Sequence, residues 1–159
     1  METTRESAKQ ESHNQLVNNL QELLEKNYDA EKGYKNALVE TKDENLKRFL
    51  KKQVVQRNHF ATELDKIIRS LNEHPKEKGS AKGDLHRTWM NIKTKLSSNK
   101  DESLLEECIR GEKASKKEYE EKLKKYKFPP SIAEVLKRQL SEISTTVEKI
   151  KKLEDLAEK

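Results

Sequence analysis

The chain has 159 residues, of which 40% are charged and only 31% belong to the hydrophobic set AVILMFWYC. Its 34 basic and 29 acidic side chains leave a net charge of +5, so the two signs nearly cancel. Disordered chains combine low hydrophobicity with high net charge, and only the first condition holds here. The composition therefore excludes a thick core of buried strands and favours long helices with narrow apolar stripes.

Membrane and disulfide-rich classes are excluded next. No segment approaches the roughly 20 consecutive apolar residues of a membrane-spanning helix. The N-terminal segment METTRESAKQ is polar and lacks an apolar signal core, so we expect a cytoplasmic protein without a membrane segment. The single cysteine, Cys108, excludes an internal disulfide and a zinc site built from several cysteines.

The first half of the chain predicts a tail and two long helices. Residues 1–12 carry no apolar stripe and are expected to be a disordered tail. Apolar residues at helical spacing predict helices over about 13–41 and 43–74. Thr41 and Asp43 precede Glu44 as a cap signal, with the capping-box spacing from Thr41 to Glu44, and a proline follows the second helix. The stripes contain Leu16, Leu20, Leu23, Leu24, Tyr34 and Leu38, and then Leu46, Phe49, Leu50, Val54, Phe60, Leu64, Ile67, Ile68 and Leu71.

The second half predicts one short helix and two long ones. The short helix covers about 84–97, with Trp89 as an expected anchor on the bundle. The long helices cover about 102–125 and 130–157, and a proline is tolerated in the first turn of the last. Their stripes contain Leu104, Leu105, Cys108, Ile109, Tyr119 and Leu123, and then Ile132, Val135, Leu136, Leu140, Ile143, Val147, Ile150 and Leu153.

These elements predict a single all-α domain over residues 13–159. Two tight hairpins join the long helices in pairs, and the segment 75–100 separates the pairs. This segment is long enough to run the length of a bundle, whereas an up-down-up-down bundle needs no such connection. We therefore expect a ferritin-like four-helix bundle with a long crossover that contains a short extra helix.

The two halves also resemble each other. The sequence LKKQ at 50–53 recurs as LKRQ at 136–139, and the same offset aligns Arg57 with Ile143 and Phe60 with Thr146. Small residues follow one face on the first and third helices, which predicts that these helices approach closely. These residues are Ala30, Gly33 and Ala37, and Cys108, Gly111 and Ser115.

Polar residues interrupt the middle of each apolar stripe. Buried carboxylates in a bundle are typical of a di-metal site, which takes a Glu from each of two helices and Glu-x-x-His from each of the other two. The histidines are at positions 13, 59, 74 and 86, and none has an acidic residue three positions before it. The interrupting residues are Asn27, Glu31, Gln53, Arg57, Glu112, Gln139 and Thr146.

Several segments resemble a bacterial family of uncharacterised ferritin-like four-helix-bundle proteins, usually labelled a domain of unknown function. The resemblance covers about residues 14–155 and carries no established activity. Its segments are 29–34 (DAEKGY), 56–57 (QR), 60–64 (FATEL), 85–93 (LHRTWMNIK) and 106–112 (EECIRGE).

The resemblance to metal-binding bundles such as bacterioferritins places Arg57 where they carry the Glu of Glu-x-x-His, and Phe60 where they carry the His. Glu31 and Glu112 would remain. The hypothesis is that the Arg57 guanidinium replaces the metal charge and binds both carboxylates, within a buried cluster completed by Asn27, Gln53 and Gln139. The alternative left open is that these groups lie off the core axis and reach solvent.

Three functions follow as expectations. The first is a non-catalytic ferritin-like bundle without cofactor, acting in interaction, assembly or stress adaptation, with a possible homodimer and an unknown protein partner. The second is an iron- or manganese-binding oxidase or storage protein. The third is a DNA-associated stress protein, which the neutral tail disfavours. The metal alternative would use Glu31, Glu63, Glu112, Glu142 and His59, and the DNA alternative the clusters Lys76, Lys78 and Lys82, and Lys122, Lys124, Lys125 and Lys127.

Overall fold

The computed structural model describes residues 4–77, 79 and 100–156, and this part of the chain contains helices and no strand. The all-helical prediction is confirmed. The predicted helix over 84–97, including Trp89, lies outside the described residues. The elements are α1 (Thr4–Glu40), α2 (Glu44–Ser70), α4 (Lys100–Lys125), α5 (Pro130–Lys149) and the short 3₁₀ helix η2 (Leu153–Leu156).

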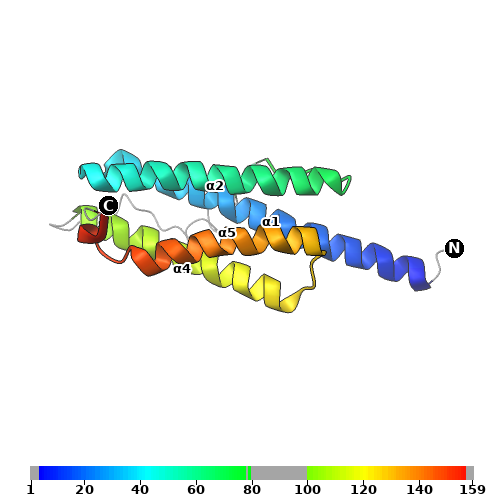
Figure 1. Ribbon diagram of the computed structural model, residues 1–159. Coiled ribbons are helices and arrows are strands. Elements are labelled where there is room, and N and C mark those ends of the chain that lie inside the picture. The colour runs from blue at the N-terminus through cyan, green and yellow to red at the C-terminus, as the bar shows by residue number, and fades with distance from the viewer. Residues whose placement is uncertain (1–3, 78, 80–99, 157–159) are drawn as a thin grey trace.

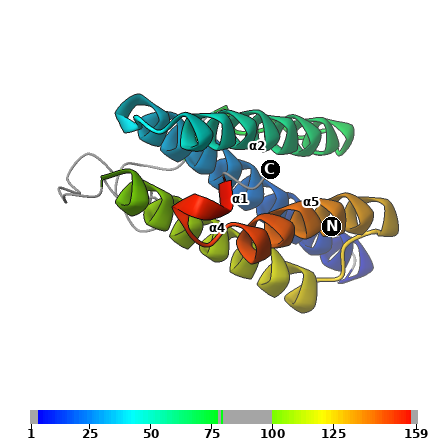
Figure 2. The same ribbon diagram turned by 60° about the vertical axis from the view of Figure 1, so that its left-hand side comes forward.

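Two antiparallel helix pairs, α1 with α2 and α4 with α5, pack against each other along α1 and α4 (Figures 1 and 2). The start of α4 lies at the turn between α1 and α2. There the Asp101 carboxylate accepts hydrogen bonds from the backbone N–H groups of Lys42 and Asp43, at 3.1 and 2.9 Å. Helix α2 ends at the opposite end of the bundle (Figure 1). The end of α2 and the start of α4 therefore lie about one length of α2 apart, which is about 40 Å at 1.5 Å per residue.

The buried apolar residues form two clusters, one toward each end of the bundle. The cluster near the α1–α2 turn includes Tyr34, Leu50 and Cys108. The second includes Phe60 and Tyr119. The small-residue faces of α1 and α4 are buried, as expected for helices that approach closely; they comprise Ala30, Gly33 and Ala37, and Cys108, Gly111 and Ser115.

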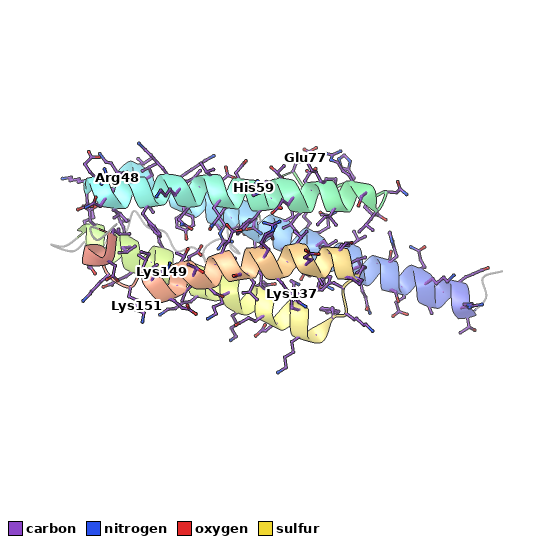
Figure 3. The ribbon with its side chains drawn as sticks, in the orientation of Figure 1. Arg48, His59, Glu77, Lys137, Lys149 and Lys151 are labelled. Carbon is purple, nitrogen blue, oxygen red and sulfur yellow. The ribbon has the colours of Figure 1, made fainter. Side chains whose placement is uncertain are left out.

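The outer faces of the bundle carry most of the charge. Figure 3 shows the long side chains projecting outward from all four helices, and Arg48, Lys137 and Lys149 are among the exposed ones. None of the described helices is both long and apolar enough to cross a bilayer. The narrow apolar stripes and the high charge content are therefore two aspects of the same amphipathic arrangement.

The first helix begins earlier than predicted. Helix α1 starts at Thr4, so most of the segment 1–12 that was expected to be a disordered tail is helical, with exposed side chains from Thr4 to Ser12. The apolar pattern could not reveal this extension, because none of its side chains from Thr4 to Ser12 is buried. Of the two residues in the predicted cap signal of α2, Asp43 is confirmed as the cap, because it accepts the Leu46 N–H at 2.8 Å, whereas Thr41 does not form the capping box. The Thr41 hydroxyl instead donates to the Ala37 carbonyl at 2.8 Å.

Helices α2 and α5 end earlier than predicted, and α4 starts slightly earlier than predicted, at Lys100. Helix α2 stops at Ser70 because Asn72 adopts a left-handed conformation (φ 63°) and the Glu73 N–H bonds back to the Ile68 carbonyl at 3.2 Å. This is a Schellman-type end. Helix α5 stops at Lys149 rather than near 157. The Asp155 carboxylate accepts the N–H groups of Lys151 and Lys152, and the chain turns so that Ile150 and Leu156 are buried.

The cap of α2 provides a test of local stability. Replacing Asp43→Ala removes the acceptor for the Leu46 N–H, and we expect the free energy of unfolding to fall by about 1 kcal/mol. The matched control is Asp43→Asn, since asparagine caps about as well as aspartate and should stay close to wild type. Urea unfolding followed by circular dichroism measures both. Equal stability of Asp43→Ala and Asp43→Asn would show that this cap does not matter.

Candidate functional site

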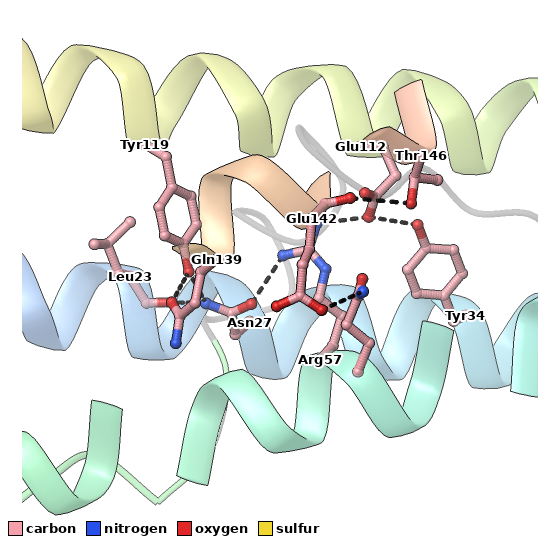
Figure 4. A network of polar contacts seen from close by, with 10 residues as sticks. Leu23, Asn27, Tyr34, Arg57, Glu112, Tyr119, Gln139, Glu142 and Thr146 are labelled. Atoms are coloured by element: carbon pink, nitrogen blue, oxygen red, sulfur yellow. Dashed lines mark hydrogen bonds and ion pairs between the residues drawn. The ribbon is translucent and has the colours of Figure 1, made fainter. Parts of the chain in front are cut away.

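A layer of polar side chains crosses the bundle between the two apolar clusters, and Arg57 lies at its centre (Figure 4). The guanidinium of this α2 residue is fully buried, and its Nη2 lies 2.6 Å from Oε1 of Glu112 on α4, which is also fully buried. Its Nη1 donates to Oδ1 of Asn27 on α1 at 2.8 Å. The side chain thus joins three helices through one ion pair and one neutral acceptor.

Tyr34 adds a second donor to the same carboxylate. Its hydroxyl donates to Oε1 of Glu112 at 2.5 Å, so this oxygen accepts from both Arg57 and Tyr34. Burial and the neighbouring Glu112 charge raise the pKa of Tyr34 well above its usual value of 10.0. Burial alone would lower the pKa of Arg57, but the Glu112 charge helps to bring the net change to an increase. The phenol therefore stays protonated and the guanidinium charged across the physiological range.

The network continues from Asn27 to α5. The Asn27 amide donates to the Tyr119 hydroxyl at 2.9 Å and to the Leu23 carbonyl at 2.8 Å. The Tyr119 hydroxyl donates to Oε1 of Gln139 at 2.7 Å, and the Gln139 amide donates to Glu63 at 3.0 Å. Burial raises the pKa of Tyr119 to about 12. All four long helices therefore contribute to one chain of hydrogen bonds.

The hydrogen-bonding groups of this polar layer are not all paired among the described residues. Four of its buried polar atoms have no hydrogen-bond partner among the described residues: Nε of Arg57, Oε2 of Glu112 and the side-chain oxygens of Gln53 and Gln56. Native interiors leave few such atoms, and each one costs stability unless water or a ligand meets it. Two of the four, Nε of Arg57 and Oε2 of Glu112, belong to the two members of the ion pair.

The sequence-predicted residues separate into two groups. Arg57, Glu112, Asn27 and Gln139 lie in the network described above. Gln53 is buried nearby, but its side-chain oxygen has no partner in the described part of the chain, and Thr146 donates only to the Glu142 carbonyl on its own helix.

Glu31 does not join the predicted cluster around Arg57. Its carboxylate pairs with Lys35, one turn later on α1, at 3.0 Å, and accepts from Asn58 at 3.4 Å instead of binding Arg57. Position 31 is rotated away from the centre of the bundle toward α2, where the charge keeps contact with solvent. Arg57 therefore binds one carboxylate, not two.

Two network residues were predicted only as apolar stripe members. Tyr34 and Tyr119 have rings that belong to the two apolar clusters and hydroxyls that reach the polar layer. A buried tyrosine hydroxyl requires a partner, so a tyrosine on a stripe beside predicted buried amides and carboxylates is the signal that could have found them.

The residues of the metal alternative do not assemble into a site. Arg138 forms an ion pair with Glu63 and lies 3.6 Å from Glu142, so a cation already occupies the space between these carboxylates. The side chain of His59 is 63% exposed. No group of three or more His, Cys, Asp or Glu able to hold a metal occurs within the described ranges.

The lysines of the DNA alternative are partly engaged in ion pairs. Lys76 pairs with Glu25 at 3.1 Å, and the buried Lys122 pairs with Glu22 and Glu118. Lys124, Lys125 and Lys127 are exposed, while Lys78 and Lys82 lie outside the described residues. The clusters therefore offer fewer free cations to a phosphate backbone than their sequence suggests.

Comparison with protein families identifies the chain. A family model described as "Domain of unknown function (DUF2383)" matches residues 15–125. The chain belongs to this family. The matched region of the DUF2383 domain includes Asn27, Arg57 and Glu112, whereas Gln139 and the rest of α5 follow it. No curated protein sequence matches the chain.

The ion pair of the DUF2383 domain predicts a specific pattern of stabilities. Glu112→Gln leaves the buried Arg57 charge uncompensated and should lower the free energy of unfolding by about 3–5 kcal/mol. Arg57→Met should cost a similar amount, whereas the double change Arg57→Met with Glu112→Leu should cost much less than the two single changes together, because neither charge remains. Urea unfolding measures the cycle.

The control for this cycle is Glu31→Gln, since the Glu31–Lys35 pair is partly exposed and should contribute at most about 1 kcal/mol. Additive losses in the double variant, or a loss for Glu31→Gln as large as that for Glu112→Gln, would contradict the central place of the Arg57–Glu112 pair.

The raised tyrosine pKa values predict how stability changes in alkali. A pKa that is higher in the folded state adds stability below the unfolded value near 10, and this stability is lost as the pH rises toward the folded value. Because Tyr119 ionises at a higher pH in the folded state, its contribution to the free energy of unfolding should fall by about 1.4 kcal/mol per pH unit between about pH 10 and 12. Urea unfolding across this range should give a flatter decline for Tyr119→Phe than for wild type; parallel declines would contradict the assignment.

Proposed function

We propose that this DUF2383 protein is a non-catalytic, ferritin-like bundle that has lost a di-metal site and acts in interaction, assembly or stress adaptation. The observation that carries the proposal is the buried Arg57 guanidinium, paired with Glu112 at 2.6 Å in the polar layer. The proposal treats this guanidinium as the permanent replacement of the metal's positive charge.

The connectivity supports the ferritin-like part of the proposal. Helix α4 begins at the α1–α2 turn, while α2 ends at the other end of the bundle, so a tight turn cannot join the end of α2 to the start of α4. One long crossover between two antiparallel pairs is the arrangement of ferritin-like bundles. The positions aligned by the internal repeat are buried on both α2 and α5, as an ancestral pair of metal-binding helices would require: Gln53 and Gln139, Arg57 and Ile143, and Phe60 and Thr146.

Charge balance supports the loss of the metals. A di-metal centre in a bundle takes about four carboxylates and two histidines. The polar layer instead holds one fully buried carboxylate, Glu112, and its charge is already balanced by Arg57. A divalent cation at this carboxylate would meet the repulsion of a permanent positive charge at close range in a buried environment. The residues present therefore do not fit two metal ions.

The remaining features suit a protein that acts through its surface. The charged outer faces keep the bundle soluble, and we extend the proposal to a cytoplasmic protein that forms a homodimer or binds another protein. Sedimentation of the purified chain tests the homodimer separately from the metal question.

Metal analysis tests the central proposal. Protein purified without chelators and dialysed against manganese or ferrous iron under anaerobic conditions should retain far less than one metal ion per chain by mass spectrometry. Glu112→Gln should retain the same low amount, because the proposal gives this carboxylate no metal to hold. Stoichiometric iron or manganese that is lost in Glu112→Gln would overturn the proposal.

A further inference from the structure

A pocket lies where the short helix η2 packs against the first turns of α2, at the end of the bundle that holds the α1–α2 turn. Its volume is about 80 Å³. The apolar part of its lining consists of Phe49, Ile150 and Leu156, which keep 8, 4 and 6% of their area exposed. This α2–η2 pocket therefore has apolar walls that are not completely covered by the rest of the bundle.

Cations lie around the opening of the α2–η2 pocket. Arg48 and Lys52, both exposed, belong to its lining. Lys51 and Lys149 are exposed as well, and each directly precedes a lining residue in the sequence. Figure 3 shows Arg48 and Lys149 at the same end of the bundle. None of these four cations forms an ion pair within the described ranges, and Arg48 donates only to the neutral side chain of Asn45.

The carboxylates at this end of the bundle do not neutralise the four cations. Glu44 pairs at 3.6 Å with a different lysine, and Asp155 accepts the backbone N–H groups of two further lysines, whose charges lie close to it. Asp43 and Asp101 accept backbone N–H groups at the α1–α2 turn. Glu148 on α5 is exposed and offsets one of the four charges. The opening of the pocket therefore keeps an excess of positive charge.

An apolar pocket beside unpaired cations favours an acidic peptide over other anionic partners. Single-stranded nucleic acids stack their bases on aromatic rings, whereas the ring in this pocket belongs to the almost completely buried Phe49. Binding to a lipid surface requires exposed apolar side chains. The large ones in the described part of the chain are Val39 and Val55, and neither lines the pocket. A peptide supplies both an apolar anchor and carboxylates.

The volume of the pocket limits the anchor to one side chain. A water molecule needs about 10–15 Å³ of such space, so the pocket takes about five to eight groups of that size. A leucine or isoleucine side chain fits, whereas an indole is too large. We propose that the α2–η2 pocket binds an acidic segment of a partner protein, with one aliphatic side chain in the pocket and carboxylates on Arg48, Lys52 and Lys149. This inference rests on the proposed role in protein interaction, but not on the loss of a metal site.

A capped peptide with a central leucine, flanked by two glutamates on each side, tests the site in the full-length protein. Amide chemical shifts in ¹H–¹⁵N spectra should saturate with a Kd of about 1 mM in about 20 mM salt, and the affinity should fall at about 150 mM salt because salt screens exposed charges. Replacing the central leucine by serine should weaken binding about tenfold, because no apolar side chain then enters the pocket.

Substitutions of the cations test the other half of the site. Lys52→Gln should weaken the affinity about threefold, and the double change Arg48→Gln with Lys52→Gln about tenfold. Both positions are exposed, so the protein should remain folded. The matched control is Lys66→Gln, which removes the same charge from an exposed position about 21 Å farther along α2, at 1.5 Å per residue, and should bind like wild type.

Several outcomes would overturn the proposal. Equal affinities of Lys52→Gln and Lys66→Gln, or of the leucine and serine peptides, would each do so. An oligothymidylate or phosphatidylserine vesicles that bind more tightly than the peptide, and lose affinity in Lys52→Gln but not in Lys66→Gln, would assign the surface to nucleic acid or lipid. A dimer that sediments as a monomer after Lys52→Gln would assign it to a second copy. Bound metal would overturn the loss of the metal site without changing these titrations, so the two failures are distinguishable.

Discussion

The buried ion pair between Arg57 and Glu112 is the constraint on which the arrangement of this bundle depends. Desolvating both groups costs several kcal/mol, and their attraction offsets that cost only when the two helices hold them in contact. Leucine stripes alone tolerate sliding of one helix along another, whereas an ion pair on α2 and α4, with Asn27 of α1 as a further acceptor, tolerates only one alignment. We interpret the polar layer as the feature that sets the register of the two helix pairs, and the apolar clusters on either side as the main source of stability.

The sequence predicts the interior of this fold better than its boundaries. Positions such as Arg57 and Glu112 follow from extending an apolar stripe through its polar interruptions, because burial repeats with the helical period. Glu31 fails this reasoning because a rotation of a few tens of degrees about the axis of α1 decides whether a side chain faces the centre or a partly exposed edge. Helix ends depend on local details that periodicity does not contain, such as the left-handed Asn72 and the Asp43 cap. The exposed start of α1 has no apolar pattern to read.

The proposed loss of a di-metal site implies that the residues of such a site cannot be replaced one at a time. A metal centre balances several carboxylates with two dications, so the loss of the metal leaves uncompensated negative charge. One arginine beside one carboxylate restores neutrality only if the other acidic or ligating positions become neutral as well. In the proposal, positions 60, 143 and 146 are the former ligand positions; they hold Phe, Ile and Thr, which are neutral, and the layer is balanced by the single Arg57–Glu112 ion pair.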